Sequence, residues 1–191
     1  KMEIQEVQKK TQEYLKKRGV LDYKLDTDLI ISFALEVPRL ELYLKQKTNI
    51  ASDKLDEIRD FVKRRGKREP MQYILGEVFF YDCRIKVDPR CLIPRPETEI
   101  LVEETLKYLR EGDRVLDLGT GSGAIALSLA KSKAGLQILA VDIEDDCVAL
   151  ARENAKELML EKKVTFLKSD WFDSFSKVEK FNLIISNPPY L

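Results

Sequence analysis

The sequence predicts an α/β protein with a parallel, doubly wound sheet that follows a small helical domain. Strand-like apolar segments alternate with helix-like segments from residue 114 to residue 186, which is the pattern of a parallel sheet. Glycines cluster where the first of these strands passes into a helix. Before residue 70, apolar side chains instead recur at helical spacing, and this spacing predicts the helical domain.

Four amphipathic helices are expected in the first part of the chain. They span residues 2–18, 25–36 and 39–47 and the segment that starts at residue 52. Gly19 stands where a helix C-cap is expected, Pro38 separates the second helix from the third, and Ser52 is the expected N-cap of the fourth.

A basic run at residues 63–68 ends this helical part. We interpret it as a solvated helix end, because cations at a helix C-terminus favour the helix dipole. Contact with an acidic or RNA-bound partner is the alternative.

Residues 72–87 are rich in β-branched and aromatic side chains and include the turn-prone Asp82, which predicts a β-hairpin. We therefore expect a helical domain at 1–71, a hairpin linker at 72–90 and an α/β domain at 91–191. In the α/β domain, strands are expected at 114–118, 137–141, 164–168 and 182–186, and helices at 94–109, 124–131 and 146–158.

Composition excludes several classes of protein. The 33 basic and 33 acidic residues cancel, so the chain lacks the global positive field of non-specific nucleic-acid binders. No apolar run approaches the roughly 20 residues that cross a bilayer. The three cysteines lie far apart in the sequence, and we expect no secretory leader, which together indicate a reducing, cytoplasmic setting. Histidine is absent, so the commonest general base and zinc ligand are excluded, and no metal is expected.

A glycine-rich loop follows strand 114–118. It consists of Asp117, Leu118, Gly119, Thr120, Gly121, Ser122 and Gly123. Glycine lets the backbone approach a ligand closely at positive φ, so the loop predicts a cofactor site. The spacing of Gly119, Gly121 and Ala124 also fits a dinucleotide site. Asp117 favours a methionine moiety instead, because an acid suits its ammonium group and would repel a pyrophosphate.

Two further strand ends carry candidate cofactor contacts. Asp142, after the second strand, can accept hydrogen bonds from both ribose hydroxyls. After the third strand, Asp170 can accept from the exocyclic amine of adenine and Trp171 can stack on its ring. Each has a structural alternative: Asp117 ties the glycine loop together, Asp142 is a helix N-cap, and Trp171 is a core residue.

Asn187, Pro188, Pro189 and Tyr190 follow the last strand at its carboxyl end, where ligands of open α/β sheets bind. The Asn187 side-chain oxygen and the Pro188 carbonyl can accept the two N–H bonds of a planar NH₂ group, which leaves the nitrogen lone pair free for attack. Proline restricts φ and so preorganises that carbonyl, and Tyr190 can stack on the planar group. The tetrapeptide predicts methyl transfer to a planar nitrogen by positioning, without a histidine.

With these residues, the chain resembles the PrmC/HemK family of protein-glutamine methyltransferases. The resemblance rests on residues 70–76, 92–99 and 117–123, on Asp142 and on residues 187–190. The segment 94–97 is its specific part. The family's sheet continues beyond such a tetrapeptide, so we expect a fragment, or the ordered part of a longer chain, in which the C-terminal part of the sheet is missing.

The resemblance implies a Rossmann-like class I methyltransferase sheet and a helical N-terminal domain that helps recognise the substrate. That substrate is the glutamine of the Gly-Gly-Gln motif in peptide chain release factors, which act in translation termination. S-adenosylmethionine is the implied cofactor and S-adenosylhomocysteine its product. Neither a membrane nor direct nucleic-acid contact is expected.

The residues and the resemblance together give the expected site. Cofactor contacts are expected from Asp117, Gly119, Thr120, Gly121, Ser122, Gly123, Asp142, Asp170, Trp171 and Asn187. Substrate contacts are expected from Asn187, Pro188, Pro189 and Tyr190, of which Asn187, Pro188 and Tyr190 are catalytic. Arg95 and Thr98 are added as residues at a helix start beside the methionine end of the cofactor.

Three other functions fit parts of the sequence. A DNA adenine methyltransferase can use the same tetrapeptide on a flipped adenine, although the charge balance and the small helical module disfavour it. A nicotinamide oxidoreductase can use the glycine loop but leaves the tetrapeptide unexplained. A non-catalytic binding protein of the same fold is disfavoured by the presence of Asp117, Asp142 and Asn187.

Overall fold

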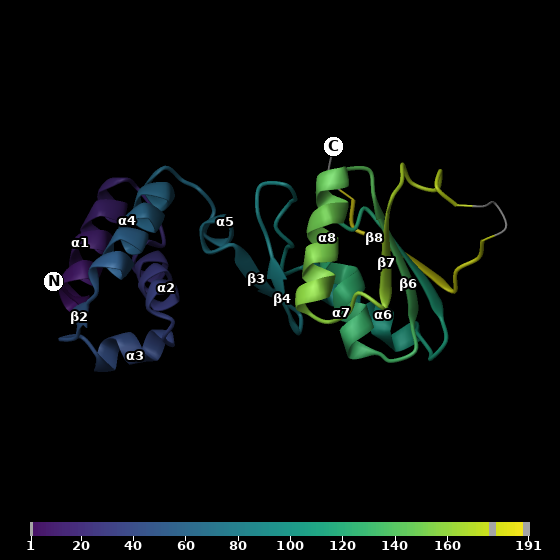
Figure 1. Cartoon of the computed structure of the whole chain (residues 1–191), viewed down its shortest axis with the longest axis horizontal. Coiled ribbons are helices and arrows are strands. Elements are labelled where there is room, and N and C mark those ends of the chain that lie inside the picture. Colours follow the sequence, from purple (N-terminus) through teal and green to yellow (C-terminus); the bar gives the residue numbers. More distant parts are fainter. Residues whose placement is uncertain (1, 176–178, 189–191) are drawn as a thin grey trace. The chain divides into compact units, whose positions relative to one another are not determined.

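The computed structural model describes residues 2–175 and 179–188. The chain divides into two compact units, Lys1–Leu75 and Gly76–Leu191, whose elements are labelled in Figure 1. Every helix among the described residues is too short or too polar to cross a membrane.

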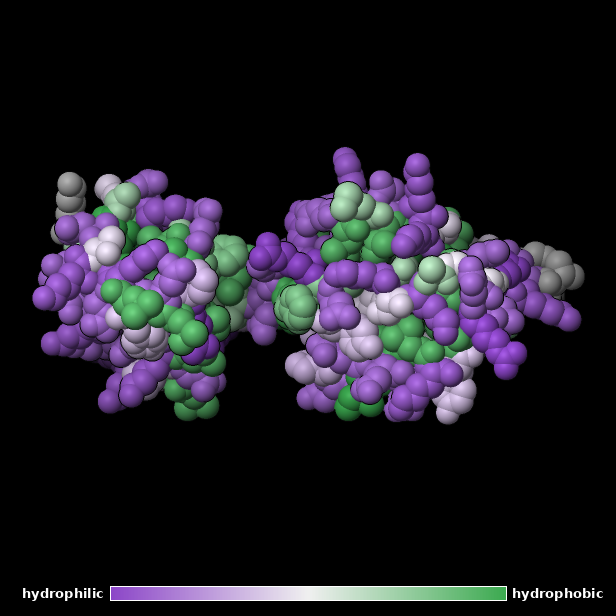
Figure 2. Space-filling model, turned by 90° about the horizontal axis from the view of Figure 1, so that it is seen from below, coloured by the Kyte–Doolittle hydropathy of each residue, from purple (hydrophilic) through white to green (hydrophobic). Residues whose placement is uncertain are grey.

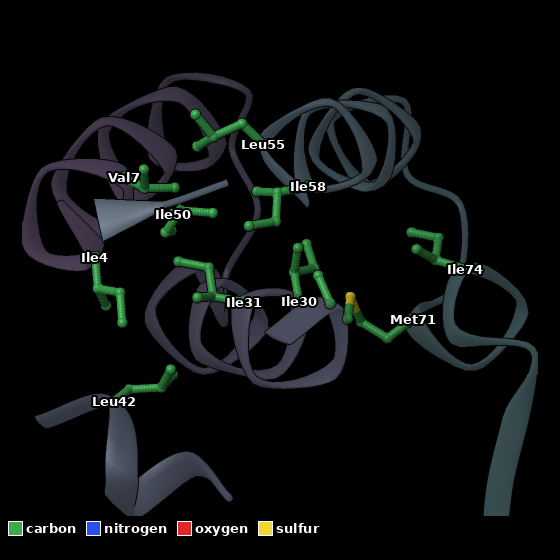
Figure 3. Close-up of a cluster of buried hydrophobic side chains, with 11 residues drawn as sticks. Ile4, Val7, Ile30, Ile31, Leu42, Ile50, Leu55, Ile58, Met71 and Ile74 are labelled. Atoms are coloured by element: carbon green, nitrogen blue, oxygen red, sulfur yellow. The ribbon is translucent and has the colours of Figure 1, made fainter. Parts of the chain in front are cut away.

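The first unit is helical. Its helices are α1 (Ile4–Lys17), α2 (Tyr23–Leu35), α3 (Arg39–Leu44), α4 (Ser52–Gly66) and α5 (Met71–Leu75), and strand β1 (Met2–Glu3) pairs antiparallel with β2 (Asn49–Ile50). Apolar side chains from these elements converge on one core, shown in Figure 3. Its labelled members are Ile4, Val7, Ile30, Ile31, Leu42, Ile50, Leu55, Ile58, Met71 and Ile74. Burial of this shared core stabilises the unit.

Two local expectations for this unit are wrong, and one pair of short strands was not expected. Ser52 is the first residue of α4, whose N-cap is Ala51, and no side chain caps that end. Residues 72–75, expected at the start of the hairpin, belong to the helix α5, because Met71 and Ile74 lie three apart and both become buried against the helical core. The β1–β2 pair was not expected, since two-residue strands carry no periodic signal.

Buried carboxylates of α2 join the helices of this unit. Asp28 accepts hydrogen bonds from Gln8 Nε2 at 3.0 Å and from the Tyr43 hydroxyl at 2.6 Å, and its hydrogen bond and charge raise the pKa of Tyr43. Asp26 accepts from Arg65 Nε at 2.6 Å. Both carboxylates are 4% exposed, and the described partners satisfy them as buried charges require.

The basic run at residues 63–68 lies at the C-terminus of α4, as predicted. Arg65 pairs with Asp26, and Arg64 forms a two-nitrogen contact with Glu69 at 2.9 and 2.5 Å. This contact raises the pKa of Arg64 and lowers that of Glu69. The two arginines therefore act within the unit, which favours the structural interpretation of the run over a partner contact.

The second unit contains a hairpin and a parallel sheet. The hairpin is β3 (Glu77–Phe80) with β4 (Cys83–Lys86), and the parallel strands are β5 (Arg114–Leu118), β6 (Gln137–Asp142), β7 (Val164–Lys168) and β8 (Leu183–Ser186). The parallel strands lie in the order β7-β6-β5-β8. The helices are α6 (Thr98–Tyr108), α7 (Ala124–Ser132) and α8 (Asp145–Glu157), and Figure 1 shows them gathered on one side of the sheet. The predicted α/β class with a Rossmann-like parallel sheet is confirmed.

Side chains alternate between the two faces along β5. Leu116 and Leu118 therefore point away from the face that carries Asp117, and they form a cluster with Val141. Phe175 and Phe181 pack against this cluster. The segment after β7 thus covers part of the sheet where no described helix lies.

Hydrophilic residues cover most of the surface that Figure 2 shows for each unit, with hydrophobic areas between them. This surface agrees with a chain of which 35% is charged. Exposed apolar side chains include Leu40 and Leu44 on α3 and, in the second unit, Ile143 and Trp171. Ile143 and Trp171 belong to the site described next.

Candidate functional site

Three parallel strands end at one edge of the sheet, and the residues that follow them form the candidate site. Leu118 of β5 lies opposite Val141 in β6 and opposite Ser186 in β8. The glycine loop, Asp142 and Asn187 are therefore brought together. The chain builds outward from β5 to β6 and β7, then returns to place β8 on the other side of β5. Ligands of open α/β sheets bind at such a switch point.

The three loop glycines serve two purposes. All have positive φ, at +71° for Gly119, +55° for Gly121 and +82° for Gly123, a region that disfavours other residues. A Cβ at Gly119 or Gly121 would meet nothing within 4 Å, because both line cavities. A Cβ at Gly123 would lie 3.1 Å from Ala151 and 3.2 Å from Phe166. Gly123 thus allows close helix packing, and its expected cofactor contact stays a prediction.

Asp142 joins the glycine loop to the turn after β6. Its Oδ2 accepts from the Gly121 backbone N–H at 2.8 Å, and its Oδ1 accepts from the Glu144 N–H at 3.1 Å. Glu144 itself is the N-cap of α8, so the N-cap alternative for Asp142 is wrong. Asp142 lines the larger of the two cavities described below, where its oxygens keep further lone pairs for a ligand.

Asp117 is fully buried beneath the loop. Its Oδ2 accepts from the Thr120 hydroxyl at 2.7 Å, while its Oδ1 has no hydrogen-bond partner among the residues that the structure describes. Burial raises the pKa of this carboxyl to about 7, although the Thr120 hydrogen bond opposes the shift. Asp117 therefore ties the loop together, and a contact between it and a cofactor ammonium group stays a prediction.

The larger cavity has a volume of about 390 Å³. Its wall includes Gly119, Gly121, Val141, Asp142, Ile143, Glu144, Cys147, Ser169, Asp170, Trp171, Leu92, Asn187 and Pro188. Trp171 is 55% exposed and has a φ of +48°, so the alternative that it is a core residue is wrong. Unusual backbone at a cavity wall is typical of functional sites. Asp170 and Trp171 both line this cavity, and their expected contact with adenine stays a prediction.

A smaller cavity of about 90 Å³ also lies against the glycine loop. Thr120 and Ser122 line it, together with Arg95 and Thr98. Leu92, Gly119, Gly121, Asn187 and Pro188 line both cavities. The shared wall means that groups in the two cavities can meet beside Asn187.

Asn187 connects β8 to the start of α6. Its Nδ2 donates to the Thr98 hydroxyl at 2.8 Å, and the preceding Ser186 hydroxyl donates to the Leu118 carbonyl at 2.8 Å. These bonds position the end of β8 beside the glycine loop. Pro189 and Tyr190, which were also expected in the site, lie outside the described residues.

Several site residues were not found from the sequence. Leu92, Ile143 and Cys147 line the larger cavity, but single apolar residues and a lone thiol carry no motif. Cys91 and Cys147, expected to be unrelated because they are far apart in the sequence, share a small buried cluster. The hydrogen bond between the two thiols accompanies a raised pKa for Cys91 and a lowered pKa for Cys147.

Two neighbouring residues of α8 hold the site in place. Asn154, fully buried, accepts from the Lys86 N–H at 2.7 Å and donates to the Ser122 carbonyl at 2.9 Å, so it joins the hairpin to the glycine loop. Glu153 accepts from Arg90 at 2.8 Å and from Lys86 at 2.6 Å. These two contacts lower the pKa of Glu153 to about 2. They anchor the segment that leads to Leu92.

Comparisons with known proteins match both units. The family described as "PrmC N-terminal domain" matches residues 6–76, and "Methyltransferase small domain" matches residues 96–191. A relative named release factor glutamine methyltransferase from Aliivibrio fischeri is 36% identical over 191 residues, which cover 100% of this chain and 67% of the relative. The chain belongs to the PrmC/HemK family of release factor glutamine methyltransferases.

This chain covers a smaller part of the length of other PrmC/HemK relatives than of the one from Aliivibrio fischeri. The one from Rhodopirellula baltica is 38% identical, with 95% of this chain and 63% of the relative covered. The one from Thermodesulfovibrio yellowstonii is 43% identical, with 85% of this chain and 58% of the relative covered. The chain thus spans about three fifths of the length of these two relatives.

Solved structures show the same fold. A tRNA methyltransferase of M. jannaschii has a TM-score of 0.51 at 23% identity, covering 60% of this chain and 35% of that one. Trm5b from Pyrococcus abyssi has a TM-score of 0.50 at 24% identity, covering 60% of this chain and 34% of that one. These likenesses agree with the Rossmann-like sheet of this PrmC/HemK member.

Proposed function

We propose that this protein transfers a methyl group from S-adenosylmethionine to the side-chain amide nitrogen of the glutamine in the Gly-Gly-Gln motif of peptide chain release factors. One observation carries the proposal: Asn187 and Pro188 line both cavities, at the end of β8 and beside the glycine loop. A cofactor on one side and an amide on the other would meet at these two residues. The names of the relatives support the same reaction.

The larger cavity fits S-adenosylmethionine in its chemistry. Gly119 and Gly121 expose backbone to it with open space where a Cβ would stand, as close contact with a cofactor needs. Asp142 would accept from the ribose hydroxyls, and Asp170 and Trp171 would hold the adenine. When bound, S-adenosylmethionine supplies a methyl group on a positively charged sulfur.

The chain's contribution to the reaction is to hold and orient the amide. An amide nitrogen is a poor nucleophile because its lone pair is delocalised. Asn187 Oδ1 and the Pro188 carbonyl would accept its two N–H bonds and so fix the direction of the lone pair. The φ restriction of proline limits the entropy lost in presenting that carbonyl. Tyr190, beyond the described residues, would stack on the amide plane.

No histidine stands in the chain, so we assign no imidazole base. After transfer, the nitrogen would lose its proton to water. Fixed acceptors act as preorganised dipoles toward the charge that develops on the nitrogen. Positioning and exclusion of water therefore account for the chemistry that these residues supply.

The helical unit would recognise the release factor, and the protein would act in the cytoplasm during translation termination. Its family match covers residues 6–76, which is most of that unit. The charge balance of the chain, 33 basic against 33 acidic residues, disfavours direct binding of nucleic acid. The names of the relatives also do not support the DNA adenine alternative.

A labelled-methyl assay tests the proposal. The protein, expressed at the full length of its gene, is incubated with methyl-labelled S-adenosylmethionine and either a release factor or duplex DNA. Label is expected in the release factor and absent from one whose Gly-Gly-Gln glutamine is replaced by alanine. Labelled DNA beside an unlabelled release factor would contradict the proposal.

A further inference from the structure

Two cysteines meet at the wall of the larger cavity. Cys91 and Cys147 are 5% and 8% exposed, and they share one small buried cluster with Leu150. Cys147 lines the larger cavity, and Cys91 directly precedes Leu92, which lines both cavities. Neither thiol takes part in the proposed methyl transfer. Thiols that lie this close together are able to form a disulfide.

The hydrogen bonds of the pair have a defined direction. The Cys147 thiol donates to the Arg90 carbonyl, with 3.4 Å between sulfur and oxygen. A carbonyl only accepts, so the single proton of Cys147 is used there. The hydrogen bond between the two thiols therefore runs from Cys91 to the Cys147 sulfur. When Cys147 loses its proton, this donor stabilises the thiolate.

Cys147 is the member of the pair that favours the thiolate form. The hydrogen bond with Cys91 lowers the pKa of Cys147, whereas burial and the charges of Asp142, Glu144 and Asp146 oppose this shift. Cys147 also lies in the first turn of α8, where the helix dipole stabilises a negative charge. The thiolate is the form of cysteine that reacts with peroxides. Cys147 is thus both the more reactive thiol and the one that lines the cavity.

We propose that Cys91 and Cys147 form a reversible disulfide at the wall of the larger cavity, and that a molecule bound in this cavity protects them from a peroxide. The cavity of about 390 Å³ gives a small oxidant a path to Cys147. Disulfide formation is independent of the proposed function. The protection rests on the proposed function, because S-adenosylmethionine is taken as the bound molecule.

The oxidation takes two steps. The Cys147 thiolate attacks one oxygen of hydrogen peroxide, the O–O bond breaks, and the released hydroxide takes up the proton that Cys147 had lost and becomes water. Cys147 is then a sulfenic acid. The Cys91 sulfur attacks the Cys147 sulfur, the S–S bond forms and the S–O bond breaks, and the leaving hydroxide becomes water with the Cys91 proton. The two sulfurs together lose the two electrons that the peroxide gains, and a dithiol such as dithiothreitol reverses the product.

Peptide mass spectrometry tests the disulfide. The protein, expressed at the full length of its gene, is treated with hydrogen peroxide, its free thiols are blocked, and it is digested without reductant. We expect a cross-linked pair of peptides that contain Cys91 and Cys147 and that dithiothreitol separates. Absence of this cross-link would overturn the inference.

Cys83 is the control within the same molecule. It is fully buried, lines neither cavity and has a pKa that burial raises. We expect its thiol to be lost at least about tenfold more slowly than that of Cys147, because exposure and thiolate character set the rate. Equal rates at Cys83 and Cys147 would contradict access through the cavity.

Two variants separate the roles of the pair. In Cys91→Ser, the sulfenic acid at Cys147 has no thiol partner and should be captured by dimedone. In Cys147→Ser, Cys91 should react as slowly as Cys83. Capture by dimedone at Cys91 in Cys147→Ser, at the rate seen for Cys147 in Cys91→Ser, would overturn the assignment of Cys147 as the thiol that is attacked.

The effect of the cofactor is measured on the wild-type protein. With S-adenosylmethionine at about ten times the Kd found by calorimetry, cross-linking should slow about tenfold, because only the cofactor-free fraction reacts. An unchanged rate with the cofactor bound would overturn the protection. If the cross-link forms but S-adenosylmethionine does not bind, the proposed function is contradicted and the disulfide is supported.

Discussion

The helical unit and the α/β unit bury carboxylates in different ways. In the helical unit, Asp26 and Asp28 are 4% exposed, and each is bonded by side chains from other helices. In the α/β unit, Asp117 is fully buried, yet its Oδ1 has no hydrogen-bond partner among the described residues. Fully satisfied buried charges are typical of structural roles, and unsatisfied ones call for a functional reason.

Positive backbone φ values lie in different surroundings in the two units. In the α/β unit, Gly119, Gly121 and Trp171 have positive φ and line the larger cavity, whereas Tyr81 and Met159 have positive φ and do not line it. In the helical unit, Glu36 has the positive φ of a helix C-cap, and Gly19 and Arg68 have positive φ shortly after the ends of α1 and α4. We infer that substitutions in the helical unit change stability first, whereas substitutions at the strand ends of the α/β unit change chemistry first.

The largest expected effect is on chemistry and comes from Asn187→Ala. Loss of the oxygen that holds the amide should lower kcat on the order of 1,000-fold. Cofactor affinity and the free energy of unfolding should be nearly unchanged. Asn182→Ala, at the other end of the same strand region and bonded to the Arg114 N–H, is the matched control. Calorimetry that shows equal loss of cofactor binding and turnover would mean that Asn187 is first a cofactor ligand.

The second effect concerns Asp117 and pH. Its pKa of about 7 in the folded protein lies above the ordinary 3.8, so the folded state binds the proton more tightly than the unfolded chain. This contribution to stability is complete below about pH 4 and is lost as the pH rises through 7, on the order of 4 kcal/mol in all. Denaturant unfolding of the wild type and of Asp117→Asn should show the loss in the wild type alone. If the unfolding free energies of the two proteins changed with pH in the same way, Asp117 would not be the source of the loss.

The third effect should appear in stability without any change in chemistry. Asp26→Ala removes the partner of Arg65, whose side chain is 19% exposed, and leaves a largely buried cation. We expect unfolding to become easier by about 2 kcal/mol, below the usual cost because Arg65 keeps its bond to the Glu69 carbonyl. Asp56→Ala breaks an exposed pair with Arg59 and should cost less than about 0.5 kcal/mol. Similar losses of unfolding free energy for Asp26→Ala and Asp56→Ala would contradict the greater importance of the buried ion pair.

The smallest effect is expected at Trp171. Trp171→Ala should weaken S-adenosylmethionine binding about fivefold, as expected for loss of one aromatic contact. Stability should hardly change because the side chain is 55% exposed. Phe172→Ala is the control, since Phe172 is 53% exposed and stands outside the residues that line the larger cavity. Isothermal titration that gives equal affinities for the two variants would exclude the stacking role.

Regular elements were predictable because their signals are local. The predicted bounds of the strands at 114–118 and 164–168 agree with β5 and β7. Each is a short run bounded by turn residues, and the glycine loop follows the first of them. Residues 72–75 were misassigned because their helical conformation depends on burial of Met71 and Ile74 against other helices. Tertiary packing overrode the local preference there.

The site was predictable only where a motif marks it. The glycine loop, Asp142 and Asn187 follow strand ends, so their meeting was expected from parallel topology. The Thr98 contact joins residues 89 positions apart, and Asn154 bonds Lys86 and Ser122, which lie 68 and 32 positions away in the sequence. Such contacts depend on how helices pack on the sheet, and one sequence gives no periodicity that reveals them.

The most direct test of the central claim is to locate the transferred methyl group. A release factor that has reacted with the protein and S-adenosylmethionine is digested, and the Gly-Gly-Gln peptide is sequenced by fragmentation mass spectrometry. One added methyl group is expected on the side-chain nitrogen of that glutamine in the wild-type reaction, and none with Asn187→Ala. A methyl group on any other side chain, or undiminished methylation with Asn187→Ala, would contradict the central claim.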